Sequence, residues 1–367
     1  MKSIIIVTAS TGAGHNQAAN SLKERFEERG IYVHIVDMFK ATSKGINALI
    51  SDGYKILATK LPKAYGAFYK SSDRKVINKT IFKNAFLATE LRLKWIFNEF
   101  QPDLIISTHP FGAPIIGKLK EKGKINIPFV QIVTDFKAHY AYIHEQVDAY
   151  IAASNFTADS LTQKGIAPQK VHVYGIPARE AFTQKNYRKF SKDRPFQLLI
   201  MGGSMGLIAI EEAVAVLLTF EKKLKLVVVC GNNRDLYDKL QRRYAEQIDS
   251  GRLEVLGFVD TVHELMDKSD LIISKPGGLT TTEAIHKSIP MIIPFAIPGQ
   301  EQENTNFLVE NEMAIEVQDM TELHDHIELL IDDVERYQKM VENMTRLAKL
   351  YSVDAIIDLC SSLIDSE

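Results

Sequence analysis

The sequence contains little cysteine. Its 367 residues include two cysteines, Cys230 and Cys360, which are too few for a disulfide framework. Both follow or flank apolar residues, so a reducing compartment is the simplest interpretation. The apolar run at residues 4–7 is too short for the hydrophobic region of a signal peptide and is better read as a buried strand. We therefore expect a cytoplasmic protein.

Long hydrophobic runs are lacking as well. No apolar stretch approaches the ~18–20 residues that a membrane-spanning helix needs, so any contact with the cell membrane should be peripheral. The formal net charge is −2. This net charge by itself is no argument for or against binding to nucleic acid. We expect no nucleic-acid partner.

A metal-binding pattern is also missing. His139 and His144 are five residues apart, which places two ligands poorly on one helical face. No cluster of cysteines or carboxylates lies near them, and the sequence therefore predicts no metal site.

Short apolar runs instead recur along the chain and mostly alternate with helical patterns. Continuous apolar runs of this kind are typical of parallel strands that are buried on both faces. The runs form two series, which predict an α/β protein with two doubly wound, Rossmann-like domains. The first series is at residues 4–7, 31–36, 104–107, 129–133, 149–152 and 171–174, and the second at 198–201, 226–229, 253–256, 271–273 and 291–293.

The boundary between the two series is predicted in a polar, basic stretch without apolar periodicity. We expect an N-terminal domain at residues 1–181, a linker at 182–195 and a C-terminal domain at 196–345. A final helical segment at 346–367 could pack against either domain. Ligands of such folds bind at the carboxyl ends of the strands, so a cleft is expected there.

Glycine-containing loops follow the first strand of each series and a later strand of the second. They read Thr-Ala-Ser-Thr-Gly-Ala-Gly-His at residues 8–15, Met-Gly-Gly-Ser-Met-Gly at 201–206 and Ser-Lys-Pro-Gly-Gly-Leu-Thr at 274–280. Each loop precedes a helix, whose N-terminus suits a phosphate group. The position three after Gly14 is Gln17, which departs from the dinucleotide-binding pattern and disfavours NAD.

Polar side chains accompany the third of these loops. Glu283 lies one turn into the following helix, where its carboxylate can accept hydrogen bonds from hydroxyl groups. Gln300 and Asn304 are four residues apart and share a helical face. Phosphate-binding loops beside several hydroxyl-binding side chains indicate a nucleotide-sugar site.

One segment interrupts the alternation of strands and helices. Residues 44–94 contain 11 basic and 3 acidic residues, and aromatic side chains are interleaved with the charges. Basic and aromatic residues on helices suit an anionic membrane surface. A helical insertion with a solvated basic face is the alternative interpretation.

These motifs, in this order, resemble glycosyltransferase family 28, and especially its diacylglycerol glycosyltransferases: the bacterial processive diacylglycerol glucosyltransferases and the plant monogalactosyldiacylglycerol synthases. The resemblance covers nearly the whole chain. Besides the three loops, it rests on Ser-Thr-His-Pro at 107–110, Val-Thr-Asp-Phe at 133–136, Tyr-Gly-Ile-Pro at 174–177, Val-Cys-Gly-Asn at 229–232, Leu-Gly-Phe-Val at 256–259 and Pro-Gly-Gln-Glu at 298–301.

The resemblance implies a GT-B fold, with two Rossmann-like domains that face a central cleft. It implies a C-terminal domain that holds a UDP-sugar, an N-terminal domain that holds a lipid acceptor such as diacylglycerol, and no cofactor other than the donor. The Lys-Pro-Gly-Gly form at 275–278 favours glycerolipid acceptors. The order Gln-Glu at 300–301 resembles enzymes that use glucose or galactose rather than N-acetylglucosamine.

Two side chains of the N-terminal half are candidates for the catalytic base. His15 follows a glycine loop at a strand end, and an ordinary histidine pKa near ~6.5 suits general-base catalysis. Asp135 also follows a strand, and it could be the base or could orient His15 or an acceptor hydroxyl. His109 precedes Pro110 and is expected to be structural or to face the acceptor.

The remaining candidates bind substrate. The two loops of the second half could share the negative charge of the departing UDP, and Lys275 could add a positive charge. By family correspondence, Phe258 and Val259 hold the uracil, Glu283 the ribose, and Gln300 and Glu301 the sugar, with support from Asn304. The substrate-binding set is Gly14, His109, Gly203, Ser204, Met205, Gly206, Phe258, Val259, Lys275, Gly277, Gly278, Leu279, Thr280, Glu283, Gln300, Glu301 and Asn304.

Three functions remain possible on these grounds. The first is an inverting transferase that moves glucose or galactose from UDP to diacylglycerol and forms a membrane glycolipid. The second is a UDP-sugar epimerase on the same fold, and the third a catalytically silent UDP-sugar-binding regulator. The basic aromatic segment and the His-Pro pair at 109–110 favour the transferase.

Overall fold

The computed structural model describes residues 2–10, 13–40, 61–74, 86–184, 191, 193–202, 207–220 and 222–365. The chain folds into two compact units. Unit 1 comprises Met1–Glu180, Ile297–Glu303 and Lys349–Glu367, and unit 2 comprises Ala181–Ala296 and Asn304–Ala348. The predicted segment at 44–94 falls partly outside the described residues, which include its parts at 61–74 and 86–94.

Unit 1 is built on a parallel six-stranded sheet with the order β2-β1-β3-β4-β5-β6. Strand β1 therefore lies between β2 and β3, and the remaining strands follow in sequence order. The elements are β1 (Ser3–Thr8), α1 (Ala13–Glu28), β2 (Tyr32–Asp37), α3 (Pro62–Ser72), α5 (Leu87–Phe100), β3 (Leu104–Ser107), α6 (Gly112–Glu121), β4 (Phe129–Ile132), η1 (Tyr140–Tyr142), β5 (Ala149–Ala152), α7 (Asn155–Gln163), η2 (Pro168–Lys170), β6 (Val171–Val173) and α17 (Val353–Asp365).

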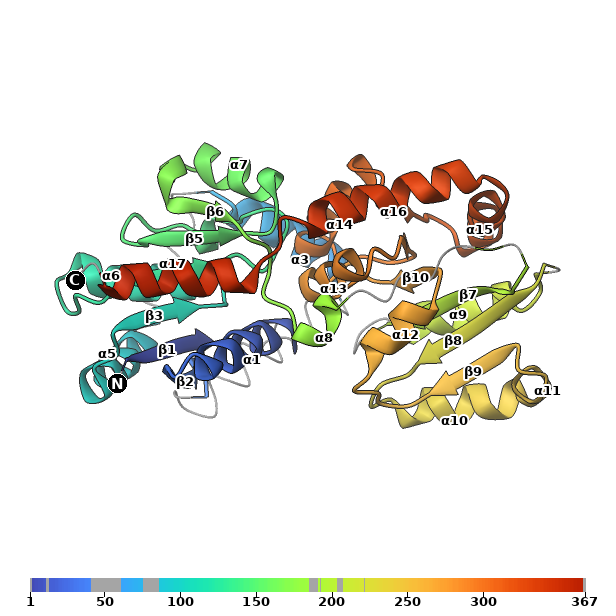
Figure 1. The fold of residues 1–367 in the computed structure, drawn as a ribbon, viewed down its shortest axis with the longest axis horizontal. Helices are drawn as coiled ribbons and strands as arrows, with labels where there is room; N and C mark the ends of the chain where they lie inside the picture. The colour runs from blue at the N-terminus through green and yellow to red at the C-terminus, as the bar shows by residue number, and fades with distance from the viewer. Residues whose placement is uncertain are drawn as a thin grey trace. The chain divides into compact units, whose positions relative to one another are not determined.

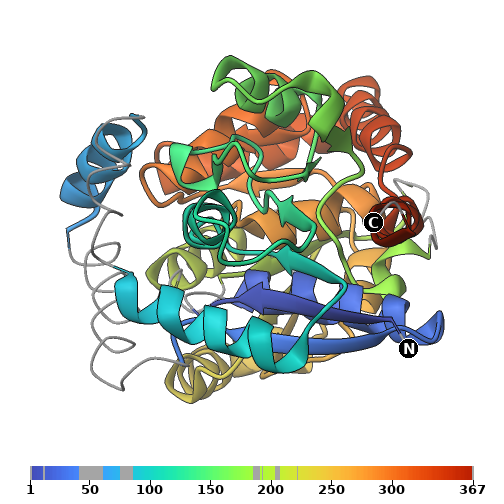
Figure 2. The same ribbon diagram turned by 90° about the vertical axis from the view of Figure 1, so that its left-hand side faces the viewer.

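The central strand β1 is buried on both faces because its apolar side chains alternate between two cores. Ile4 and Ile6 pack with residues of α1 and α17, while Ile5 and Val7 pack with α5 and α6. The C-terminal helix α17 thus covers the same face of the sheet as α1 (Figure 1). Figure 2 shows α5, in cyan, along the outside of this unit.

Charged pairs on the surface accompany the packing of α17 against α1. Arg25 lies 2.9 Å from Asp354, and Arg29 lies 3.0 Å from the same carboxylate. Exposed pairs of this kind contribute little stability, so the buried residues Ile356, Ile357 and Cys360 provide most of the attachment.

Unit 2 contains a second parallel six-stranded sheet, with the order β12-β11-β10-β7-β8-β9. Counted from its own first strand, this is the order 3-2-1-4-5-6 of a nucleotide-binding fold, read from the other edge. The elements are α8 (Glu180–Thr183), β7 (Phe196–Met201), α9 (Leu207–Leu217), β8 (Leu224–Val229), α10 (Arg234–Arg243), α11 (Ala245–Asp249), β9 (Leu253–Leu256), α12 (Val262–Lys268), β10 (Leu271–Ser274), α13 (Gly278–Lys287), β11 (Met291–Ile293), α14 (Gln300–Glu310), β12 (Ala314–Glu316), η3 (Met320–Glu322), α15 (Leu323–Asp332) and α16 (Val334–Ala348).

Residues 297–303 pack with unit 1, although the sequence places them within the second series. A Cβ on Gly66 of α3 would lie 2.8 Å from Cβ of Pro298, so the two segments are in close contact. Lys137 also pairs with Glu303 at 2.8 Å. The first residues of α14 therefore belong to unit 1, and the rest of the helix belongs to unit 2.

The topology of each sheet identifies where a ligand can enter. In open α/β sheets, ligands bind at the carboxyl ends of the strands where the strand order reverses. These switch points lie between β1 and β3 in unit 1 and between β7 and β10 in unit 2. His15 follows β1, and Lys275 follows β10, so each switch point carries a residue that the sequence singled out.

Candidate functional site

His15 lies in the first turn of α1, at the switch point of unit 1. Its Nδ1 atom is 2.8 Å from the backbone oxygen of Thr108, which follows β3. The hydroxyl of Thr108 in turn donates to the backbone oxygen of His15, at 3.0 Å. These two reciprocal bonds attach the start of α1 to the end of β3 and fix the direction of the imidazole.

The hydrogen bond to Thr108 also determines the tautomer of His15. A carbonyl oxygen can only accept, so the proton of the neutral ring resides on Nδ1 and the lone pair on Nε2. Burial lowers the pKa of His15 to about 4, although the hydrogen bond to Thr108 offsets part of that effect. At neutral pH the ring is therefore uncharged, and Nε2 is able to accept a proton.

Asp135 is buried just beyond the end of β4. Its Oδ2 accepts a hydrogen bond of 2.7 Å from the hydroxyl of Tyr142. Its Oδ1 accepts a hydrogen bond from Nε2 of Gln300. The two predicted residues Asp135 and Gln300 thus meet within unit 1, while Asp135 and His15 are connected through other side chains.

That connection runs through Thr134 and Tyr142. The Thr134 hydroxyl lies 3.1 Å from Nδ1 of His15 and 2.9 Å from the Tyr142 hydroxyl. Burial, together with the negative charge of Asp135, raises the pKa of Tyr142 well above its ordinary value, so its hydroxyl keeps its proton. Sequence reasoning missed Tyr142, because a tyrosine in a single 3₁₀ turn produces no periodic pattern.

His109 lies beside His15, with ring centroids 4.6 Å apart in an edge-to-face arrangement. Its Nδ1 accepts a hydrogen bond of 3.2 Å from the backbone nitrogen of Phe111. Phe39 and Phe111 lie against the same ring, with centroids at 5.8 Å and 5.0 Å. Burial and the neighbouring His15 hold the pKa of His109 well below its ordinary value, so the ring beside His15 is uncharged at neutral pH.

A second polar network holds the loop before His15. The Asp37 carboxylate at the end of β2 accepts hydrogen bonds from the backbone and the hydroxyl of Ser10, at 3.1 Å and 2.5 Å. Asn16 donates to the Ser10 hydroxyl at 3.1 Å and accepts from the Thr8 hydroxyl at 3.0 Å. Hydrogen bonds therefore hold Ser10, before the first glycine of this motif, and Asn16, after its last glycine, Gly14.

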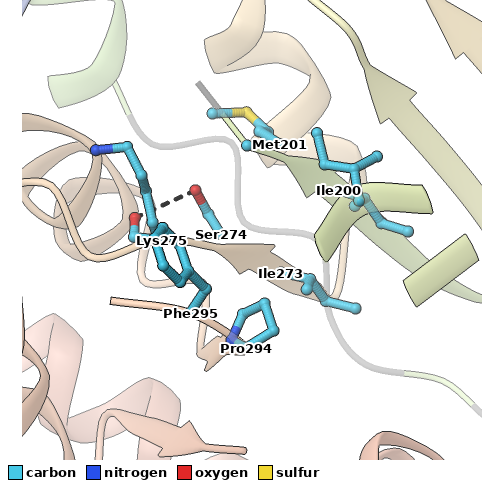
Figure 3. Close-up of a pocket in the computed structure, with 9 residues that line it drawn as sticks. Ile200, Met201, Ile273, Ser274, Lys275, Pro294 and Phe295 are labelled. Atoms are coloured by element: carbon cyan, nitrogen blue, oxygen red, sulfur yellow. Dashed lines mark hydrogen bonds between the residues drawn. The ribbon is translucent and has the colours of Figure 1, made fainter. Parts of the chain in front are cut away.

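Unit 2 contains a pocket at its own switch point (Figure 3). Its empty volume, including the part open to solvent, is about 250 Å³. Figure 3 shows Ile200 and Ile273 on one side, with the amine of Lys275 extended away from them. The lining residues are Ile200, Met201, Gly202, Ile210, Ile273, Ser274, Lys275, Pro294 and Phe295. They come from the ends of β7, β10 and β11 and from α9.

A lysine and the N-terminus of a helix place positive charge beside this pocket. Lys275 Nζ lies 3.7 Å from the point that a Cβ on Gly277 would occupy, and Gly277 is the N-cap of α13. The N-terminus of a helix carries a partial positive charge, so a lysine ammonium there is favourable when an anion is bound. Asn304, which is fully buried, donates to the backbone oxygen of Pro276 at 2.9 Å and holds this turn in place.

The other predicted residues of unit 2 lie in and around the same turn. Gly278, Leu279 and Thr280 form the first turn of α13, and Glu283 is buried further along it. Phe258 and Val259 follow β9, and the side chain of Phe258 is 65% exposed. Gly203, Ser204, Met205 and Gly206 lie outside the described residues.

Glu301 is buried, and its carboxylate accepts a hydrogen bond of 3.0 Å from the backbone nitrogen of Ile297. This contact stabilises the turn that precedes α14. The assignment of Gln300 and Glu301 to the sugar therefore stays a prediction, since both side chains are engaged with protein groups.

The described part of the chain offers neither a metal-binding cluster nor a membrane-spanning helix. No group of three or more His, Cys, Asp or Glu residues in the described ranges is arranged to hold a metal ion. Within those same ranges, no helix has the length and apolar character needed to cross a bilayer.

Two family models match the chain. One, described as monogalactosyldiacylglycerol (MGDG) synthase, matches residues 15–178, and the other, described as glycosyltransferase family 28 C-terminal domain, matches residues 197–358. The processive diacylglycerol beta-glucosyltransferase of Bacillus subtilis (strain 168) is 31% identical over 368 residues, which cover 97% of this chain and 94% of that protein. The resemblance inferred from the motifs is confirmed.

Solved structures share the fold. MurG of Acinetobacter baumannii has a TM-score of 0.67 at 18% identity, covering 99% of this chain and 100% of MurG. Alr3699/HepE of Anabaena, in complex with UDP, has a TM-score of 0.58 at 14% identity, covering 100% of both chains. The predicted fold class, α/β of the GT-B type with two doubly wound halves, is confirmed.

Proposed function

The chain belongs to the glycosyltransferase family of the processive diacylglycerol beta-glucosyltransferases, and on this premise we propose that it transfers a hexose from a UDP-sugar to diacylglycerol. The observation that carries the proposal is the state of His15. Its Nδ1 bonds the Thr108 carbonyl at 2.8 Å, so a neutral imidazole presents the lone pair of Nε2 to an acceptor hydroxyl.

The reaction is a single displacement at the anomeric carbon. His15 Nε2 takes the proton of the acceptor hydroxyl, and the acceptor oxygen forms a bond to C1 of the sugar. The bond between C1 and the UDP oxygen breaks, and its electron pair leaves with UDP. Attack from the side opposite the leaving group inverts the configuration at C1.

The leaving group is stabilised in unit 2. The N-terminus of α13 and the ammonium of Lys275, which lies beside Gly277, supply positive charge where the diphosphate gains negative charge. We assign Gly277, Gly278, Leu279 and Thr280 to the diphosphate. Gly203, Ser204, Met205 and Gly206 are proposed for the same group on the basis of sequence.

The nucleoside and the sugar are assigned to the remaining predicted residues. Glu283 is proposed for the ribose hydroxyls, and Phe258 and Val259 for the uracil. Gln300 and Glu301 are proposed for the hexose, with glucose or galactose as the donor sugar, and Asn304 as the residue that holds the turn at Pro276. No cofactor besides the UDP-sugar enters this proposal, so transfer is expected to continue in EDTA.

Helix α5 is the proposed contact with an anionic membrane surface. Leu87, Leu91 and Trp95 recur every four residues along it, and their side chains are 56%, 62% and 51% exposed. Arg92 lies over the Trp95 ring, 4.4 Å from its centroid. An exposed apolar stripe with adjacent positive charge suits the boundary between headgroups and acyl chains. The protein is then expected in the cytoplasm, bound peripherally to the cell membrane.

The first experiment measures release of UDP from UDP-glucose, UDP-galactose and UDP-N-acetylglucosamine, with and without diacylglycerol in anionic micelles. Release that depends on diacylglycerol supports the proposal and identifies the donor. Release without lipid would indicate hydrolysis or a soluble acceptor. Interconversion of the UDP-sugars would indicate an epimerase, and binding without any turnover would indicate a regulator.

A further inference from the structure

A continuous chain of hydrogen bonds joins the Asp135 carboxylate to the imidazole of His15. The distances are 2.7 Å from the Tyr142 hydroxyl to Asp135 Oδ2, 2.9 Å from Tyr142 to the Thr134 hydroxyl, and 3.1 Å from Thr134 to His15 Nδ1. The chain is assembled from the loop after β4, the 3₁₀ turn η1 and the start of α1. The start of α1 is distant in sequence from the other two segments, and the three meet at the carboxyl edge of the sheet.

The chemistry of its two ends gives each bond a direction, and the Thr134 hydroxyl, which also lies 3.4 Å from the Thr108 backbone oxygen, is closer to the Tyr142 hydroxyl at 2.9 Å. A carboxylate accepts, so the Tyr142 hydroxyl donates to Asp135. The Tyr142 oxygen must then accept from the Thr134 hydroxyl. Nδ1 of His15 carries one proton, which it shares between the Thr108 carbonyl at 2.8 Å and the Thr134 oxygen at 3.1 Å. All three donors point from His15 toward the negative charge.

We propose that Tyr142 and Thr134 are positioning residues through which Asp135 supports the imidazolium that forms on His15 during glycosyl transfer. This inference rests on the proposed function, in which Nε2 of His15 takes the acceptor proton. Hydrogen bonds that share a direction polarise one another, so the charge of Asp135 acts on the ring although the two side chains are not in contact. No proton needs to move along the chain.

The same geometry separates the roles of the two candidate bases. The oxygens of Asp135 accept hydrogen bonds from Tyr142 and from Gln300, so both oxygens are already engaged with protein donors. Nδ1 of His15 takes part in the chain of hydrogen bonds, and Nε2 is left to bind the acceptor hydroxyl. His15 is accordingly the base, and Asp135 acts through Tyr142 and Thr134.

A second buried tyrosine of unit 1, Tyr150, has a hydroxyl with a structural role and serves as a comparison. The Tyr150 hydroxyl accepts from the backbone nitrogen of His144 and donates to the backbone oxygen of the same residue, each at 3.0 Å. It holds a turn. The Tyr142 hydroxyl bonds instead to the side chains of Thr134 and Asp135.

The experiment compares Tyr142→Phe, Thr134→Val, Thr134→Ser and the double variant Tyr142→Phe/Thr134→Val, with Tyr150→Phe as the control. Steady-state release of UDP is measured with diacylglycerol in anionic micelles, and UDP affinity and Tm are measured in parallel. Tyr142→Phe and Thr134→Val should each lower kcat by about tenfold, as expected when a buried hydrogen bond linked to a charged group is lost. The KM for the UDP-sugar should remain within about twofold, because ground-state binding does not use the chain.

Three results would support the inference together. Thr134→Ser keeps the hydroxyl and should retain kcat, while the double variant should be no slower than the slower single variant, because either change breaks the same chain. Tyr150→Phe should retain kcat whether or not its Tm changes. A wild-type kcat in Tyr142→Phe, or multiplied effects in the double variant, would overturn it. Failure of the proposed function is distinguishable, because the wild-type protein would then show no lipid-dependent release of UDP.

Discussion

The Nδ1 atom of His15 lies 2.8 Å from the backbone oxygen of Thr108, and this contact sets the tautomer of the ring on which the proposed transfer depends. The group in direct contact with Nδ1 is a backbone carbonyl, whereas in other histidine-based catalysts it is a carboxylate. Because the carbonyl is uncharged, it favours one tautomer without strongly raising the basicity of the ring. Burial can then lower the pKa of the ring to about 4.

The dependence of activity on pH should reflect this lowered pKa. His15 loses its function only when it is protonated, so kcat/KM should stay level from about pH 8 down to about pH 5 and fall toward pH 4, whereas an ordinary histidine would give a decline near ~6.5. The groups that face His15 are the ring of His109, which burial keeps neutral, and the chain through Tyr142 to Asp135. Initial rates and far-UV circular dichroism at each pH make the measurement. A decline centred near ~6.5 in a folded protein would contradict it.

Replacement of His15 by alanine should separate catalysis from donor binding. General-base catalysis contributes about 10²–10⁴-fold, so His15→Ala should lower turnover by orders of magnitude. UDP affinity should be nearly unchanged, because the proposed diphosphate site lies in unit 2. Kinetics and isothermal titration with UDP test both statements, and a variant that no longer binds UDP would show that the site is misplaced.

The strands could be predicted from the sequence where their residues form a clear apolar pattern. The strands at 104–107, 149–152, 253–256 and 291–293 were predicted with the observed bounds. Three of them are fully buried and read as apolar runs, while β9 alternates apolar and partly exposed residues. Strand β12 (Ala314–Glu316) was missed. It is an edge strand that ends in a glutamate and is only partly buried, so it does not read as an apolar run.

The candidate site was predictable where a loop motif marked it. His15 and Lys275 follow glycine-containing turns or buried strands, and both lie at a switch point of strand order. The connection from His15 to Thr134 and Tyr142 was not predictable, because His15 becomes a neighbour of Thr134 only when the loop after β4 folds against α1. The support of the first loop by Asp37 depends in the same way on the pairing of β1 with β2.

Lys275 provides a test of the diphosphate site. Lys275→Ala removes the ammonium beside the N-terminus of α13, and UDP affinity should fall by about tenfold or more, the range for a hydrogen bond to a charged group. Lys239→Ala is the control, because Lys239 is 54% exposed and pairs with Glu211, an arrangement that contributes little. Isothermal titration with UDP at two salt concentrations measures both, and equal affinities in the two variants would remove Lys275 from the site.

The membrane contact can be followed through a single residue, because Trp95 is the only tryptophan of the 367-residue chain. Its side chain is 51% exposed on α5. Insertion of this face into a bilayer moves the indole out of water, so anionic vesicles should shift its fluorescence to shorter wavelengths, and more so at low salt.

Leu91→Glu should require roughly tenfold more lipid for the same shift, since a buried leucine contributes about 1.5–3 kcal/mol and the new carboxylate is repelled by the anionic surface. Leu350→Glu is the matched control, because Leu350 is 46% exposed and lies outside α5. A Trp95 spectrum that vesicles leave unchanged would show that α5 does not enter the bilayer. Equal loss in both variants would show that the effect comes from added negative charge and not from the apolar stripe, so that lipid attraction would have to be assigned to basic residues instead.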